Sequence, residues 1–127
     1  MKTIPLEQAK RLSELGIREK AKYWHCGIAD YEQNTDFIDK WFLCEKMPNG
    51  TFMHFINWGD IKQVTPMEKP YPAYTLDELF DVAKELNSTD DYWTFWDFHR
   101  FWQDRKQDIL TALYEWVCEM SKEVKDE

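Results

Sequence analysis

The residues of this 127-residue sequence that could bind a transition metal are three histidines and three cysteines: His25, His54, His99, Cys26, Cys44 and Cys118. A zinc site needs four such ligands in tetrahedral geometry. In one register of an expected β-hairpin, Cys44 and His54 lie opposite each other. Under the turn that an Asn-Gly pair favours, Cys44 instead faces Phe55 and His54 faces Glu45. The cysteines are odd in number and form no Cys-x-x-Cys pair, so we expect reduced, buried thiols with neither a metal site nor a disulfide.

Catalytic chemistry would need a nucleophile beside a base, or a pair of carboxylates. The sequence contains no nucleophile elbow, and its four glycines form no phosphate-binding loop. Two acidic groups, Asp77-Glu78-Asp81 and Asp90-Asp91, could act in acid–base catalysis or hold a cation. Carboxylates at the start of a helix also stabilise the positive end of its dipole, which gives these groups a structural explanation. We therefore expect a non-enzymatic protein with no catalytic residue and no cofactor.

Aromatic side chains dominate the composition, with seven Trp, six Tyr and eight Phe. Each can bury roughly 150–250 Å², which exceeds what one small core needs, so some should lie in a contact with another molecule. Seven of the eleven residues from Tyr92 to Trp102 are aromatic, a density typical of surfaces that stack on nucleic-acid bases. Such surfaces also need a basic groove, whereas this segment lies among aspartates. A protein partner or a homo-oligomer is therefore favoured, with Trp41, Trp58, Trp93 and Trp96 as the candidate contact residues.

The charge balance argues against direct binding of nucleic acid or of an anionic membrane. Lys and Arg number 16 against 24 Asp and Glu, a formal net charge of −8. Residues 1–22 are net basic and the remainder is strongly acidic, so an acidic mimic of DNA that inhibits a nucleic-acid enzyme is the alternative hypothesis. The mean hydropathy is −0.70, and no apolar run approaches the roughly 18 residues that a transmembrane helix needs. With no apolar signal core near Met1, a cytoplasmic location is expected.

Three helices can be placed from apolar periodicity and capping residues. The first, over residues 4–15, has Thr3 as its expected cap and ends at Gly16. The second begins at the capping box Thr75-Leu76-Asp77-Glu78 and runs to about residue 86. The third covers about residues 108–122 and is followed by a charged tail, 122–127, that we expect to be frayed.

The strands are predicted from aromatic and aliphatic runs between turn residues. Residues 21–28 form a short strand, followed by a polar loop over 30–36. A hairpin joins residues 37–46 to 51–58 through a two-residue turn at Asn49-Gly50, which places Trp41 opposite Trp58. Residues 59–74, rich in proline, read as an extended connection.

The aromatic segment 92–102 gives conflicting signals. Its composition favours a strand, whereas Thr94, Asp97 and Arg100 recur every three residues, as in a helix. A strand that turns near Asp104 is the preferred interpretation.

Three helical motifs together resemble a group of small phage and prophage proteins. They are the opening Leu6-Glu7-Gln8-Ala9-Lys10-Arg11-Leu12-Ser13-Glu14-Leu15-Gly16, the central Pro72-Ala73-Tyr74-Thr75-Leu76-Asp77-Glu78-Leu79, and the closing Thr111-Ala112-Leu113-Tyr114-Glu115-Trp116. The resemblance covers about a third of the chain and departs from the group's pattern between Asp90 and Gln107, where the usual second strand pair is too short. It implies a fold and a phage context, and no activity.

Together these patterns predict a single α+β domain over residues 1–127. A small antiparallel sheet with a central β-hairpin should pack with about three helices. The expected function is that of a non-enzymatic phage accessory protein that acts through protein contact, including contact with itself.

Overall fold

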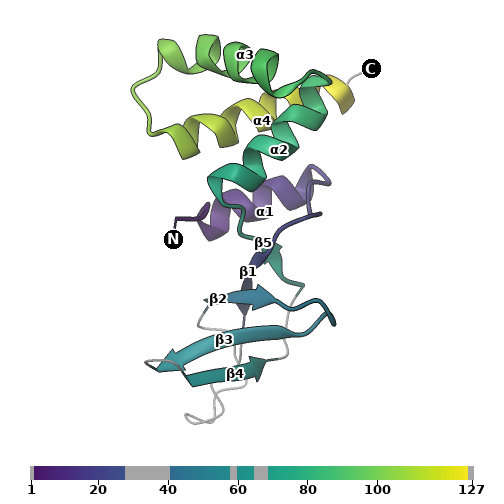
Figure 1. The fold of residues 1–127 in the computed structure, drawn as a ribbon, viewed down its shortest axis with the longest axis vertical. Coiled ribbons are helices and arrows are strands. Elements are labelled where there is room, and N and C mark those ends of the chain that lie inside the picture. The colour runs from purple at the N-terminus through teal and green to yellow at the C-terminus, as the bar shows by residue number, and fades with distance from the viewer. Residues whose placement is uncertain (1, 28–40, 58–59, 65–68, 126–127) are drawn as a thin grey trace.

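The computed structural model describes residues 2–27, 41–57, 60–64 and 69–125, and it has the predicted α+β architecture. Its elements, in chain order, are α1 (Leu6–Glu14), β1 (Tyr23–Gly27), β2 (Trp41–Lys46), β3 (Phe52–Asn57), β4 (Asp60–Val64), β5 (Tyr71–Pro72), α2 (Leu76–Asn87), α3 (Asp91–Gln103) and α4 (Ile109–Lys125). Figure 1 shows the sheet at one end of the molecule, α1 in the middle, and α2, α3 and α4 at the other end.

The sheet is antiparallel throughout and has the strand order β4-β3-β2-β1-β5. β1 lies between β2 and β5: it pairs with β2 along its whole length and with the short β5 on its other side. β5 in turn packs on α1, so this edge joins the sheet to the helices (Figure 1). The expected polar loop at 30–36 lies outside the described residues.

The central hairpin is present, but its turn differs from the prediction by one residue. Gly50 N–H donates to Met47 O at 2.9 Å, and Gly50 has φ +90° whereas Asn49 is not among the residues with positive φ. Pro48, whose ring fixes φ near −65°, therefore starts a type I turn that Gly50 completes as a bulge, and the type I′ turn at Asn49-Gly50 is wrong. The register is Glu45↔Met53, so the predicted facing of Glu45 and His54 is wrong as well. Trp58, predicted to face Trp41, lies outside the described residues.

Two strands replace part of the predicted extended connection over 59–74. β4 pairs with β3 and includes a register shift between Phe55 and Asn57. β5 is a two-residue strand that ends in Pro72 at the edge of the sheet, where the missing proline N–H breaks no ladder. The prolines of this segment hid the strands because proline is otherwise rare within sheets.

The aromatic segment is a helix, α3, which corrects the preferred strand interpretation and raises the number of helices in the described chain to four. The Asp90 carboxylate caps it by accepting from Trp93 N–H at 3.0 Å. Thr94 and Phe98 are buried on its inner face, one helical turn apart. The three-residue recurrence of polar positions was the correct signal, and burial of one face outweighed the strand preference of the aromatic residues.

The other helices follow the predictions closely. The capping box of α2 is formed, with Thr75 N–H donating to Glu78 Oε1 at 3.0 Å. Gly16, at φ +85°, ends α1 in a Schellman motif in which Ile17 N–H bonds to Leu12 O. Thr3 does not cap α1, because it forms a β-bridge with Thr75 instead. α4 extends to Lys125, beyond its expected end.

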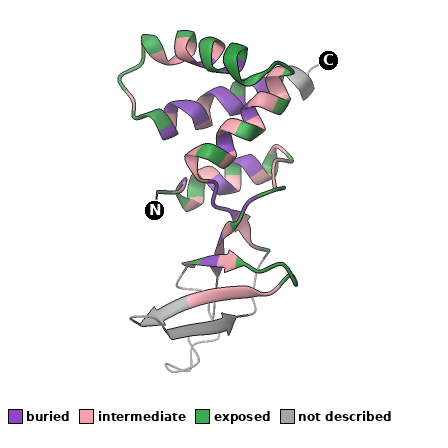
Figure 2. Ribbon diagram, viewed as in Figure 1, coloured by how far each residue is buried: buried purple, intermediate pink, exposed green. Residues whose placement is uncertain are grey.

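The core lies where the helices meet one another and the β1 edge, as the buried segments in Figure 2 show. Its largest fully buried side chains include Tyr74, whose hydroxyl donates to Glu19 O at 2.7 Å. Burial, reinforced by the nearby Glu78 carboxylate, raises the pKa of Tyr74 well above its usual range. The hydroxyl is therefore a permanent donor that fixes the loop after α1.

Candidate protein-contact surface

Helix α3 carries large aromatic side chains on both of its faces. Besides Thr94 and Phe98, its inner face includes Phe101 and Trp102, which pack on the core. Its outer face exposes Tyr92, Trp93, Phe95 and Trp96, with exposed fractions of 61, 55, 54 and 42 %. We call these four residues, together with the half-exposed His99, the α3 outer face.

The rings of the α3 outer face contact one another. Tyr92 lies edge-on to Trp93, with centroids 5.2 Å apart, and to Trp96 at 6.3 Å. His99 lies edge-on to Trp96 at 5.8 Å and stacks parallel to Phe95 at 6.4 Å. Edge-to-face and offset contacts are the favoured arrangements of aromatic pairs, so the rings form a continuous aromatic surface.

Side-chain hydrogen bonds at its N-terminal end hold α3 against the turn that follows α2. Asn87 Nδ2 donates to Asp97 Oδ2 at 2.9 Å and to Thr89 Oγ1 at 2.8 Å. The Thr89 and Thr94 hydroxyls are 2.8 Å apart, which satisfies the buried Thr94. An ion pair of 2.8 Å joins Lys84 of α2 to Asp91 of α3. The helix is thus fixed in rotation, with its outer face directed to solvent.

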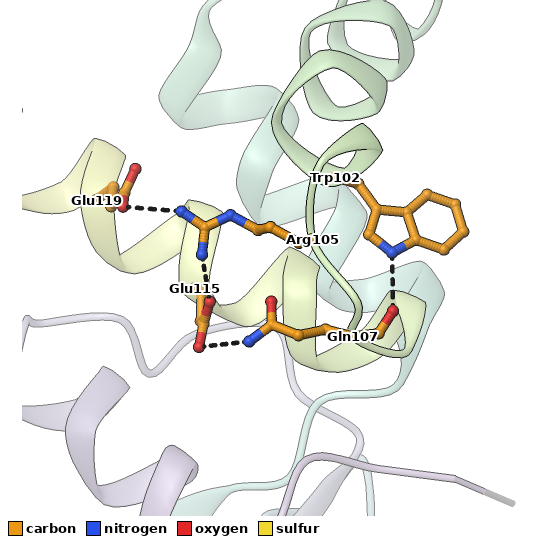
Figure 3. Close-up of polar contacts among 5 residues, drawn as sticks. All are labelled: Trp102, Arg105, Gln107, Glu115 and Glu119. Carbon is orange, nitrogen blue, oxygen red and sulfur yellow. Dashed lines mark hydrogen bonds and ion pairs between the residues drawn. The ribbon is translucent and has the colours of Figure 1, made fainter.

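A second set of contacts holds the other end of α3 against α4 (Figure 3). The Trp102 indole donates to Gln107 O at 2.9 Å, and Gln107 Nε2 donates to Glu115 Oε1 at 2.9 Å. Arg105 binds the same carboxylate through Nη1 at 2.8 Å and reaches Glu119 at 3.6 Å. Because Glu115 receives both donors, the turn between the two helices is tied to one point on α4.

Trp41 lies far from α3, in a different environment. Its ring is 5.8 Å from that of Tyr71, and Lys10 Nζ lies 5.2 Å above Trp41 and 5.7 Å above Tyr71. The Arg18 guanidinium lies 6.0 Å from the Tyr71 ring. We call these four residues the Trp41 cluster. Both rings are half-buried, and the cations favour the negative ring faces.

The four tryptophans predicted as contact residues therefore do not form one surface. Trp93 and Trp96 lie together on α3, and Trp41 lies near the β1–β5 edge with Lys10 of α1. Trp58 lies outside the described residues. Tyr92, Phe95 and His99, which belong with Trp93 and Trp96, were missed by the strand interpretation, although their spacing of three and four residues on a helix would have identified them.

The three cysteines are buried free thiols, as predicted. A hydrogen bond with Cys44, together with burial, raises the pKa of the Cys26 thiol, and burial raises that of Cys118, which disfavours the reactive thiolate. No group of three or more His, Cys, Asp or Glu side chains in the described part of the chain is arranged to hold a metal ion.

A cavity of about 260 Å³ lies between the loop after α1 and helix α2. Four acidic residues line it: Glu19, Glu78, Asp81 and Glu85. Glu78 serves the capping box of α2 and accepts from Lys22 N–H at 2.8 Å, and Glu85 binds Lys20. None of the three histidines lines it. Glu78 and Glu85 therefore serve contacts within the fold at the edge of this cavity.

Comparison with family models, with curated proteins and with solved structures gives no match to this chain. Within the described residues, no helix has both the length and the apolar character needed to cross a membrane.

Proposed function

We propose that this protein acts by binding another protein chain through the α3 outer face. A single observation carries the proposal: four large aromatic side chains lie exposed on a helix whose opposite face is in the core. Contiguous apolar patches larger than a few hundred Å² are rare on monomers, and the largest apolar patch of a protein is often a site of interaction.

The organisation of α3 supports a contact surface. Tyr and Trp are enriched where interfaces gain most of their binding energy. The helix is tied at its N-terminal end through Asp91, at its middle through Asp97, and just past its C-terminal end through Arg105. Binding therefore orders little additional backbone. Pre-organisation of this kind lowers the entropic cost of association.

Site-specific photo-crosslinking in cells that express the chain tests the proposal. A photo-reactive phenylalanine analogue in place of Phe95 should give a covalent adduct of defined mass. The same analogue at Met47, which is exposed in the hairpin turn, is the matched control and should give none. The adduct should be lost when Trp96 is changed to serine, because serine removes a central ring of the surface.

Adducts of equal yield from positions 95 and 47, or none from either, would contradict the proposal. An adduct from position 95 whose partner binds nucleic acid and is released by salt would instead favour an acidic DNA mimic, since salt screens electrostatic steering.

A further inference from the structure

We infer that the occupant of the α3 outer face is the α3 outer face of a second copy of this chain. The two helices would pair antiparallel about a two-fold axis between Phe95 and Trp96. This inference rests on the proposed function and names its partner.

The apolar stripe of α3 is self-complementary. Tyr92, Phe95, Trp96 and His99 occupy positions i, i+3, i+4 and i+7, so they lie along one side of the helix. A two-fold axis between Phe95 and Trp96 places Tyr92 opposite His99 of the second copy and Phe95 opposite Trp96 of the second copy. Such an interface closes on itself and gives a dimer, because both copies use the same patch.

The contact would bury no unpaired carboxylate, even though the chain has a net charge of −8. The stripe itself contains neither Asp nor Glu. Of the aspartates within α3, Asp91 is paired with Lys84 at 2.8 Å and Asp97 accepts from Asn87 at 2.9 Å. Like charges within α3 therefore oppose the pairing only weakly, and added salt should screen the remaining repulsion between two acidic chains.

Arg100 supplies the complementary charge. It is exposed, it follows Trp93 by seven residues and so lies on the same flank of α3, and in the part of the chain that the structure describes it has no ion pair. In an antiparallel pair about this axis, equivalent flanks of the two helices meet. Each Arg100 would lie close to Trp93 of the other copy, and a guanidinium over an indole ring is a favourable contact.

The position of α3 leaves room for a second copy, because the helix lies at the end of the molecule opposite the sheet, with its exposed side outward (Figures 1 and 2). Four rings that are about half exposed, each of roughly 150–250 Å², offer about 400 Å² per copy. A standard interface buries about 800 Å² per partner. The dimer should accordingly be weak, with a dissociation constant of about 10–100 µM.

Sedimentation equilibrium of the full chain tests the inference. The parent should populate the dimer across the micromolar range and more strongly at about 0.5 M than at 0.05 M salt. Trp96→Asp should raise the dissociation constant at least about tenfold, because it places a carboxylate beside its own symmetry mate. Met47→Asp, the matched control in the exposed hairpin turn, should leave it unchanged. Circular dichroism and urea unfolding establish that each variant is folded.

A double-mutant cycle tests the arrangement more finely. Arg100→Gln and Trp93→Ser should each weaken the dimer a few-fold, and their combination should weaken it no more than the stronger single change, because both remove the same contact.

Three results would overturn the inference: a folded parent that stays monomeric to about 500 µM, a dimer that Trp96→Asp leaves intact, or strictly additive effects at positions 93 and 100. A monomer whose position 95 still crosslinks to another protein overturns only the identity of the partner. A monomer with no adduct at position 95 removes the proposed function as well.

Discussion

The α3 outer face and the Trp41 cluster contain the same kind of side chain in two different states. In the Trp41 cluster, Lys10 lies over both rings and Arg18 lies over Tyr71, so the fold itself supplies cationic partners. On the α3 outer face, the ring–ring contacts of the described residues are among these rings and with His99, and no cation lies over them. A high aromatic content therefore does not by itself indicate a binding surface.

The two regions differ in whether a long cationic side chain reaches the aromatic rings. Lys10 lies on α1, which packs on β5, and its aliphatic stem allows the ammonium group to reach Tyr71 and Trp41. The one basic residue within α3, Arg100, lies over none of the rings in the described structure. The Trp41 cluster is consequently a structural feature, and the α3 outer face is the candidate contact surface.

The largest expected effect separates the two faces of α3 itself. Phe98→Ala should lower the free energy of unfolding by about 3–5 kcal/mol, because it leaves a cavity beside Trp102 and Trp116, whose rings lie 5.9 and 5.6 Å from that of Phe98. Phe95→Ala, on the exposed side of the same helix, should change the free energy by no more than about 0.5 kcal/mol. Urea unfolding at a protein concentration well below that of association measures both.

Equal losses at positions 98 and 95 would show that the outer face is packed within the monomer. The comparison between the two aromatic regions would then fail, and the case for a partner would fail with it.

A smaller difference should separate the two regions directly. Trp41→Ala should cost about 2 kcal/mol of unfolding free energy, because the half-buried ring packs on Tyr71 and attracts Lys10. Trp93→Ala should cost less than about 0.5 kcal/mol in the dilute monomer. In association measurements the order should reverse, with Trp93→Ala weakening the dimer and Trp41→Ala leaving it unchanged. An effect of Trp41→Ala on association would merge the two regions into one surface.

The contribution of the cation itself should be smaller again. Lys10→Met keeps most of the aliphatic stem and removes the charge, so it should lower the unfolding free energy by about 0.5–1 kcal/mol. In a Trp41→Ala background, the loss of unfolding free energy caused by Lys10→Met should be smaller. It should not be zero, because Lys10 still lies over Tyr71. Arg11→Met, at the next position of α1, is the control and should have a smaller effect, because Arg11 makes an exposed ion pair with Glu14. Equal losses at the two positions would argue against a cation–π contribution.

Local signals in the sequence predicted most of the helices correctly. The capping box at Thr75 and Glu78 and the positive φ of Gly16 depend on residues a few positions apart, and local hydrogen bonding decides them. Local turn residues also predicted the hairpin correctly, but they predicted the wrong register. Pro48 and Asn49-Gly50 favour different turns, and the fixed φ of proline decided between them.

Whether each aromatic region is packed within the fold or exposed depends on contacts between residues that are distant in the sequence. Nothing local to Trp41 indicates that Lys10, on a separate helix, lies above it. In α3 the strand preference of Trp, Tyr and Phe concealed the helix, because such preferences reflect packing surroundings more than the backbone. Trp93 and Trp96 were identified as contact candidates from composition alone, and the residues that complete their surface became evident only with the helical geometry.

The smallest expected effect concerns a histidine on the structural side of the comparison. His25 lies in β1 opposite Tyr71 of β5, and its Nε2 is 2.8 Å from Ile4 O. Burial lowers the pKa of His25 from its ordinary value of 6.5, and the bond to the Ile4 carbonyl offsets this only in part. The unfolded chain therefore binds a proton more readily than the folded one. The contribution of His25 to stability is complete above about pH 6.5 and is lost as the pH falls through the folded pKa.

Urea midpoints between about pH 7.5 and 5 should fall in the parent and fall less in His25→Gln, which keeps a side-chain N–H donor. Because His25 belongs to the β1–β5 edge, the loss should appear in unfolding of the dilute monomer. An identical pH dependence in parent and variant would show that protonation of His25 does not destabilise this edge.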